Sequence, residues 1–87
     1  SQPAAPPTLP APPPQVIPAD TVYAALSDPT RRRLLQILAH GQGLTATALA
    51  GNVGKRLDAT LKHLVALRVA GLVVTAENPQ DGRRLLY

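Results

Sequence analysis

Residues 45–73, TATALAGNVGKRLDATLKHLVALRVAGLV, decide the fold of this chain. Thr45 is a plausible N-cap for a short helix over residues 46–51, because its hydroxyl can accept a hydrogen bond from the first helical turn. Residues 52–54, Asn-Val-Gly, predict a tight turn. A longer helix then follows over residues 56–70, and Gly71 ends it. The stretch therefore predicts two helices of unequal length joined by a tight turn.

The longer helix is expected to bury its leucines. They recur at spacings of four, three and three: Leu57, Leu61, Leu64 and Leu67. At about 100° per residue these positions share one side of a helix, with Thr60 at its edge. Lys62, Ala59 and Ala66 fall on the opposite side, and His63 lies between the two. The pattern predicts an apolar inner side and an outer side with a basic residue.

Two helices are expected upstream. Asp20 can cap a short helix over residues 21–26. Asp28 followed by Pro29 is a strong helix start, since Asp accepts hydrogen bonds from the first turn and Pro at the first position needs no donor. This second helix is predicted to continue through His40. Its buried stripe is Leu34, Leu35, Ile37 and Leu38.

A β-hairpin is expected downstream. Residues 72–75 are mostly β-branched and apolar, which favours a strand. Residues 78–82 are dense in turn formers, and residues 83–87 read as the returning strand, with Arg83 and Arg84 near the tip. The fold class is therefore mainly α with a small β-hairpin, in the order helix, helix, helix, helix, strand, strand.

The first 18 residues have a different composition, with eight of the chain's 10 prolines and no charged residue. Proline fixes φ and disfavours the helical region in the preceding residue, so this segment favours polyproline II geometry. We expect residues 1–18 to be a disordered linker or tail and residues 19–87 to be the folded domain. The segment is either a spacer to a further domain or a ligand for a proline-binding groove.

Composition excludes several classes of protein. The chain has no Cys, which excludes disulfides, thiolate metal sites and a Cys nucleophile. No apolar run approaches the ~20 residues that span a bilayer, and no signal peptide is apparent, so we expect a cytoplasmic protein without a membrane segment. No paired carboxylates or Gly-rich phosphate loop are present. We therefore expect no enzyme, no catalytic residue, no metal site and no cofactor.

The short helix, tight turn and longer helix form a helix-turn-helix layout, and the hairpin makes it winged. The chain resembles the ArsR family of winged-helix transcription regulators, with MarR-type repressors as close relatives. Residues 25–35, ALSDPTRRRLL, resemble the family's L-x-D-P-T-R-x-x-I-L opening. Residues 62–73, KHLVALRVAGLV, resemble its H-L-x-x-L-x-x-A-G-L-V end, and residues 44–49 lie between the two blocks.

The resemblance implies sequence-specific binding of double-stranded DNA, usually by a homodimer on a palindromic operator. It places the recognition helix, about residues 56–70, in the major groove and the wing, residues 72–87, on the backbone or minor groove. The chain departs from the family at residues 55–57, Lys-Arg-Leu, where relatives often have Leu-Ser-Gln. It also has Leu61 where a Ser is common, so one polar contact with DNA is missing from the pattern.

The candidate DNA-contacting residues are Lys55, Arg56, Thr60, Lys62, His63, Arg83, Arg84, Arg31, Arg32 and Thr45. The arginines at 31–33 either clamp a phosphate or form a solvated helix face, and His63 either contacts DNA or forms a hydrogen bond within the fold. The chain has only two aromatic residues, both Tyr, which favours duplex DNA over stacked single strands.

A second class of function is a winged-helix module that binds another protein. Such modules lose positive charge from the recognition helix and wing, whereas this chain keeps it. Many relatives dimerise through a further C-terminal helix. The sequence ends at Tyr87, inside the second wing strand, so we expect either a homodimer through the N-terminal helix or a fragment of a longer protein with a further domain.

Overall fold

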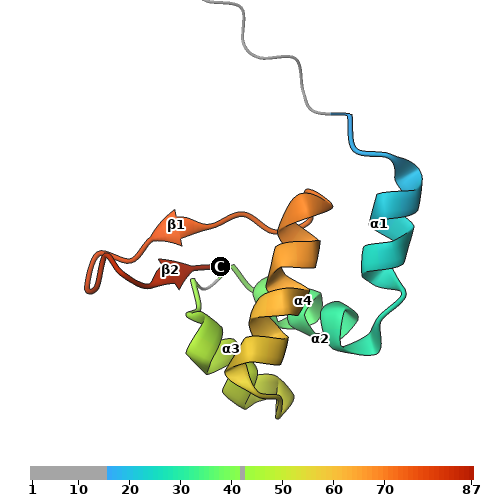
Figure 1. The fold of residues 1–87 in the computed structure, drawn as a ribbon. Helices are drawn as coiled ribbons and strands as arrows, with labels where there is room; N and C mark the ends of the chain where they lie inside the picture. The colour runs from blue at the N-terminus through green and yellow to red at the C-terminus, as the bar shows by residue number, and fades with distance from the viewer. Residues whose placement is uncertain (1–15, 42) are drawn as a thin grey trace, which may run out of the picture.

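The computed structural model describes residues 16–41 and 43–87, and in them four helices precede a two-stranded hairpin (Figure 1). The elements are α1 (Ala19–Leu26), α2 (Pro29–Leu38), α3 (Ala46–Val53), α4 (Leu57–Val69), β1 (Ala76–Glu77) and β2 (Leu85–Leu86). The predicted fold class and element order are confirmed. The expected linker falls mainly on residues 1–15, which lie outside the described residues.

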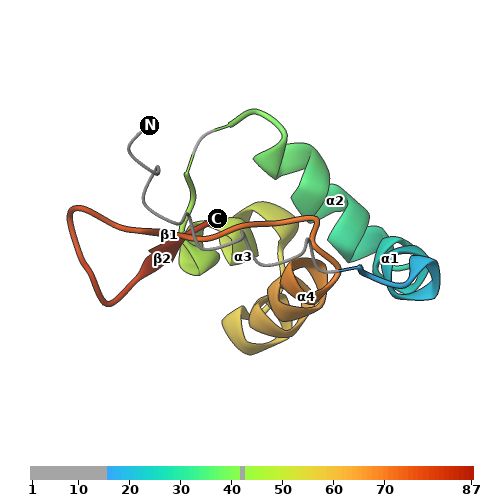
Figure 2. The same ribbon diagram turned by 90° about the horizontal axis from the view of Figure 1, so that it is seen from above.

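A small apolar core joins all four helices. Its buried members are Ala25, Leu34, Leu49, Leu64, Leu67, Ala70 and Val73. Seen from above, α2, α3 and α4 pack around one centre, α1 lies at one end beside α2, and the hairpin extends away at the other end (Figure 2). This arrangement leaves one long side of α4 and both sides of the hairpin tip in solvent.

The start of α2 forms as the sequence predicts. Asp28 is the N-cap, and its Oδ1 accepts hydrogen bonds from the backbone N–H groups of Thr30 at 2.7 Å and Arg31 at 3.2 Å. Leu34 is fully buried, and the rest of the predicted stripe is partly buried against the core. The helix ends at Leu38 rather than His40, because the following residues form a turn into Gly41.

The predicted start of α1 is wrong. The helix begins at Ala19 with Pro18 in the N-cap position, and no side chain caps it. The carbonyl of Pro18 accepts from the N–H of Thr21 at 3.0 Å, so Asp20 lies inside the first turn. An acidic side chain at that position still favours the helix through its dipole.

The short helix α3 is longer than predicted. Thr45 is its N-cap, with Oγ1 accepting from the N–H of Ala48 at 3.2 Å. Asn52 and Val53 are helical rather than part of the turn, and Asn52 Nδ2 donates to the carbonyl of Ala48 at 3.0 Å. Gly54 ends the helix with φ of 66°, a left-handed conformation that side chains disfavour.

The hairpin is shorter and lies later in the chain than predicted. Ala76 pairs with Leu86 and Glu77 with Leu85, whereas residues 72–75 form no strand. Val73 is instead buried in the core. The N–H of Tyr87 donates to the carbonyl of Leu44 at 2.8 Å, and the reverse bond measures 3.2 Å. The hairpin is thereby fastened to the chain just before α3.

The N-cap of α2 makes the fold sensitive to acid. Partial burial acts to raise the pKa of Asp28, but the N–H groups of Arg31 and Thr30, and then the adjoining His63 and Arg31 side chains, hold it below its ordinary value of 3.8. Because the folded pKa lies below the unfolded one, the ionised carboxylate stabilises the fold above the unfolded pKa. This stabilisation is lost as the pH falls through the folded pKa.

Asp28→Asn keeps an oxygen acceptor at the cap but removes the titration. We expect the free energy of unfolding to fall less steeply with acid in the variant than in the wild-type chain. Urea denaturation at neutral pH and at a pH below 3.8 measures the difference. Equal losses in the two chains would show that ionised Asp28 does not stabilise the fold.

Candidate nucleic-acid interface

The turn between α3 and α4 fixes where α4 begins. The N–H of Lys55 donates to the carbonyl of Ala50 at 3.1 Å, directly after the left-handed Gly54. Arg56 occupies the N-cap position of α4, and its side chain makes no capping bond. The first turn of α4 therefore follows two basic residues, but it also holds Asp58, whose Oδ1 accepts a hydrogen bond from the N–H of Ala59 at 2.9 Å.

The buried side of α4 differs from the predicted one. Thr60, Leu64 and Leu67 are fully buried, whereas Leu57 is 44% and Leu61 is 38% exposed. Six residues separate Leu61 from Leu67, which places them about 120° apart at about 100° per residue. A core centred on Leu64 and Leu67 therefore leaves Leu61 at its edge. Leu57 lies about 20° from Leu64 around the helix, and it is exposed at the first position of α4.

The observed buried side of α4 is turned relative to the predicted one, and Thr60 therefore lies in the core and not at its edge. Its side chain has no exposed surface, and its Oγ1 donates to the carbonyl of Arg56 at 2.9 Å. It fastens the start of α4 from inside the core and is not accessible to a ligand. Ala59 and Ala66 are partly buried as well, so they do not supply the small outer surface that the sequence predicted.

His63 links α4 to the start of α2. Its Nδ1 accepts a hydrogen bond from Arg31 Nε at 3.1 Å and lies 4.0 Å from Asp28 Oδ1. His63 and Arg31 are both only partly exposed. Of the two alternatives for His63, this geometry matches the hydrogen bond within the fold.

The predicted phosphate clamp of α2 forms internal contacts. Arg32 Nη1 donates to the carbonyl of Leu26 at 2.8 Å, and Arg31 Nη1 lies 3.5 Å from the carbonyl of Ala24. These carbonyls belong to the last turn of α1, and that of Ala24 also accepts from the N–H and the hydroxyl of the C-cap residue Ser27. Arg31 and Arg32 thus fasten the α1–α2 corner, and the Thr45 hydroxyl is likewise used, as the α3 cap.

Two carboxylates lie beside three of the outer cations. Arg56 Nε is 3.4 Å from Asp58 Oδ1 in α4. In the hairpin, Arg83 Nε is 3.6 Å from Asp81 Oδ1, and Arg84 Nε is 3.7 Å from Asp81 Oδ2. These pairs are exposed, so each stabilises the fold little and a stronger anion can compete for the arginine.

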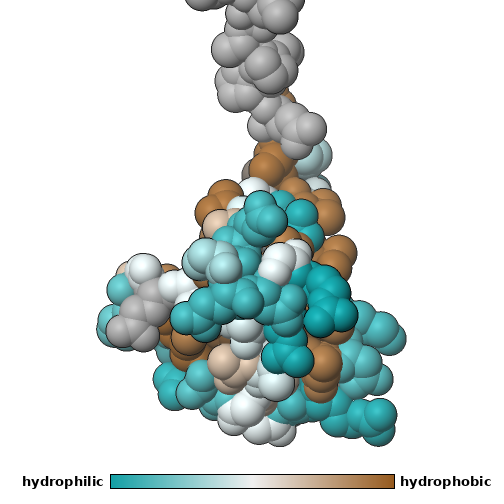
Figure 3. Space-filling view, turned by 90° about the vertical axis from the view of Figure 1, so that its left-hand side faces the viewer, coloured by the Kyte–Doolittle hydropathy of each residue, from teal (hydrophilic) through white to brown (hydrophobic). Residues whose placement is uncertain are grey.

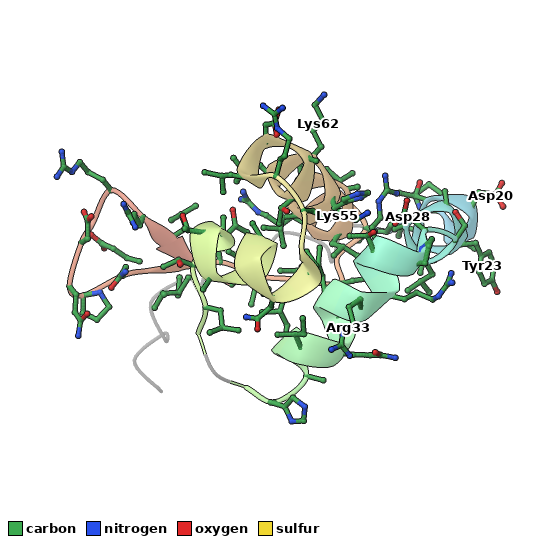
Figure 4. The ribbon with its side chains drawn as sticks, turned by 90° about the horizontal axis from the view of Figure 1, so that it is seen from below. Asp20, Tyr23, Asp28, Arg33, Lys55 and Lys62 are labelled. Carbon is green, nitrogen blue, oxygen red and sulfur yellow. The ribbon has the colours of Figure 1, made fainter. Side chains whose placement is uncertain are left out.

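Lys55 and Lys62 form no salt bridge within the described residues. Seen from below, Lys62 projects outward from α4, and Arg33 projects from α2 at the opposite edge of the molecule (Figure 4). Viewed along the hairpin, the surface is mostly hydrophilic, with hydrophobic residues exposed in patches (Figure 3).

The hairpin and the start of α4 border one hollow of about 370 Å³. It is lined by Thr45, Ala46, Thr47, Leu57, Leu61, Arg83, Arg84, Leu85 and Tyr87. Arginines from the wing thus face the first turns of α4 across an open space.

A family model described as a helix-turn-helix domain matches residues 26–76, more than half of the chain. The chain belongs to this helix-turn-helix family. The matched segment runs from the end of α1 to the first residue of β1, and the family is ArsR-like. No curated protein gave a significant match. Membership indicates DNA binding, and helix-turn-helix domains are typically non-catalytic.

The helix-turn-helix domain brings together part of the predicted site. Lys55, Arg56 and Lys62 lie on the turn and outer side of α4, and Arg83 and Arg84 lie on the wing. Each of the other candidates forms a hydrogen bond within the domain, and among them Thr60 is fully buried whereas Arg32 stays exposed: Thr60, His63, Arg31, Arg32 and Thr45.

Two features of this helix-turn-helix domain differ from the sequence-based expectation. Leu57 and Leu61 line the hollow instead of the core, and Asp81 pairs with both wing arginines. The position of Thr60 could have indicated that Leu61 is exposed. A core centred on Leu64 and Leu67 brings Thr60 inward and turns Leu61 outward.

Neither a metal cluster nor a membrane span is found in the described part of the helix-turn-helix domain. Among residues 16–41 and 43–87, no three His, Asp or Glu side chains are grouped so that they could hold a metal ion. No helix in these residues has the length and apolar character needed to cross a bilayer.

Proposed function

We propose that this chain is a cytoplasmic, sequence-specific regulator of transcription that binds double-stranded DNA. In this proposal α4 enters the major groove, and the wing, residues 72–87, contacts the backbone or minor groove. Residues 1–18 are a linker or tail, and residues 19–87 are the DNA-binding domain. The N-terminal half of a recognition helix is the part that usually reaches base edges.

One observation carries the proposal: the wing arginines and the start of α4 border the same hollow. Lys62 projects outward from α4, and Lys55 lies at the turn before α4; neither side chain lines the hollow itself. A duplex presents phosphates on both sides of a groove, so cations on two separate elements can each meet a strand. The chain's formal net charge of +4 favours approach to such a polyanion.

Binding of duplexes from a random pool, followed along a salt series, tests the proposal. We expect enrichment of one motif and a linear fall of log K with log[salt], with a slope of about −0.9 per phosphate neutralised. The absence of duplex binding at low salt, or binding that ignores salt, would instead favour the protein-binding module.

The carboxylate of Asp81 is expected to weaken DNA binding, because it competes with phosphate for Arg83 and Arg84. Asp81→Asn keeps the acceptor for the Arg83 N–H, which lies 3.1 Å from Oδ1, but removes the charge. An exposed ion pair contributes ~0.2–1 kcal/mol, so we expect duplex affinity to rise by about 1.5- to 5-fold.

Fluorescence anisotropy with a labelled duplex measures this gain. Glu77→Gln is the matched control, since it removes one negative charge from β1 without breaking an ion pair of the described residues. Equal gains in both variants would assign the effect to net charge instead of to release of the arginines.

We also propose that the domain binds a palindromic operator as a homodimer, with recognition helices about 34 Å apart to match one turn of DNA. A fold of this size buries little apolar surface, and dimerisation would add to it. Sedimentation at high concentration tests this assembly, with and without duplex. A monomer under both conditions would contradict it.

A further inference from the structure

Two leucines are exposed in the first two turns of α4, beside the charged Asp58 and Lys62. Leu57 and Leu61 are 44% and 38% exposed and lie one helical turn apart, at positions i and i+4. A single exposed leucine is ordinary on a protein surface. Here two of them lie in the centre of the proposed DNA-binding surface and line the same hollow as Arg83 and Arg84.

The lining of this hollow, with two arginines and two leucines, suits a partner that combines negative charge with small apolar groups. Arg56 directly precedes Leu57 and Lys62 directly follows Leu61 in the chain, and the two wing arginines line the same hollow as the leucines. The nearby carboxylates of Asp58 and Asp81 are already beside arginines. In duplex DNA, phosphates supply the negative charge, and the C5-methyl group of thymine is the apolar group at the floor of the major groove.

We propose that Leu57 and Leu61 determine specificity by contacting thymine methyl groups in the operator, an inference that rests on the proposed function. Leucine neither donates nor accepts a hydrogen bond, so these positions select a base by its methyl group. The Cβ atoms of an i, i+4 pair lie about 5–6 Å apart, and successive bases rise about 3.4 Å. The two leucines therefore reach thymines one or two base steps apart.

Replacement of thymine by deoxyuridine removes only the methyl group and tests this directly. The probe is the duplex recovered from the random pool, with each thymine replaced in turn. We expect about fourfold weaker binding at one or two positions, corresponding to about 0.8 kcal/mol for each methyl withdrawn from contact. The other thymines are expected to tolerate the change.

Protein variants assign the effect to the two side chains. Leu61→Ala and Leu57→Ala should each abolish the thymine preference at one position, whereas Leu61→Met, which keeps an apolar side chain, should retain it. Val69→Ala is the matched control, because Val69 is also exposed on α4 but lies in its last turn. Circular dichroism confirms that each variant is folded.

The outcomes separate this inference from the proposed function. Salt-dependent binding of a defined motif with no loss on deoxyuridine replacement overturns the thymine contact and leaves the proposed function intact. The thymine contact is also overturned if deoxyuridine replacement weakens binding by the same factor in the wild-type chain and in both alanine variants. If the wild-type chain binds no duplex at low salt, both proposals fail, and the exposed leucines are then assigned to a protein partner.

Discussion

Leu64→Ala is expected to unfold the domain, or to lower its free energy of unfolding by about 2–5 kcal/mol, the range for a buried leucine. Leu64 has no exposed surface and belongs to the cluster that joins α4 to α2 and α3. In a domain of this size such a loss is a large part of the total stability. Urea denaturation followed by circular dichroism measures it.

Leu57→Ala is the matched control for this prediction. It removes the same atoms from the same helix, but at a position that is 44% exposed. We expect a smaller loss of stability, because nearly half of the residue's surface already contacts water, whereas Leu64 has none exposed. A mild effect of Leu64→Ala together with a severe effect of Leu57→Ala would mean that the core contacts the first turn of α4 and not its middle, in contradiction to this structure.

Lys62→Ala is expected to weaken binding to the selected duplex by about 5- to 150-fold, since a contact with a base edge is worth about 1–3 kcal/mol. Lys62 projects from the exposed side of α4 and forms no salt bridge within the described residues (Figure 4). The loss should be smaller on unrelated duplexes. Anisotropy titrations on both kinds of duplex at one salt concentration measure the difference.

Arg33→Ala removes the same charge from the opposite edge of the domain (Figure 4). We expect little change in affinity, because Arg33 lies on α2, away from the hollow between the wing and α4. If Arg33→Ala weakens binding as much as Lys62→Ala does, net charge governs binding and α4 is not the element that reads the sequence.

Local signals in the sequence were sufficient for the order of the elements. Asp28 and Thr45 cap their helices as predicted, and Gly54 takes the left-handed conformation at the end of α3. Each of these features depends on one residue and its immediate neighbours in the chain, so it can be predicted from the sequence alone. The start of α1 was predicted two residues too late. Asp20 is a common N-cap residue, but Pro18 occupies the N-cap position and the helix begins at Ala19.

The rotation of α4 was not predictable from leucine spacing alone. A stripe read over residues 57–67 spreads across a wide arc of the helix, and packing against α2 and α3 selects which part is buried. That selection brings Thr60 into the core, where its hydroxyl is satisfied by the Arg56 carbonyl. The candidate site changed accordingly, from a polar outer side to an apolar one flanked by cations.

The functions of the predicted basic residues also depended on tertiary contacts. Arg31 and Arg32 resemble a basic cluster in the sequence, but both fasten the end of α1 in the structure. The wing arginines remain at the surface, yet Asp81 lies beside both. Only the folded chain distinguishes a cation that completes a helix end from one that is free to meet a phosphate.

Nuclear magnetic resonance of the ¹⁵N-labelled domain with its selected duplex tests the central claim most directly, because each backbone amide reports on its own surroundings. The predicted result is that residues 55–62 and residues 83–84 show the largest shifts, while α1 and Arg33 change little. Shifts concentrated on α1 or on the α2 side, with the wing and the start of α4 unchanged, would contradict the assignment of this surface to DNA.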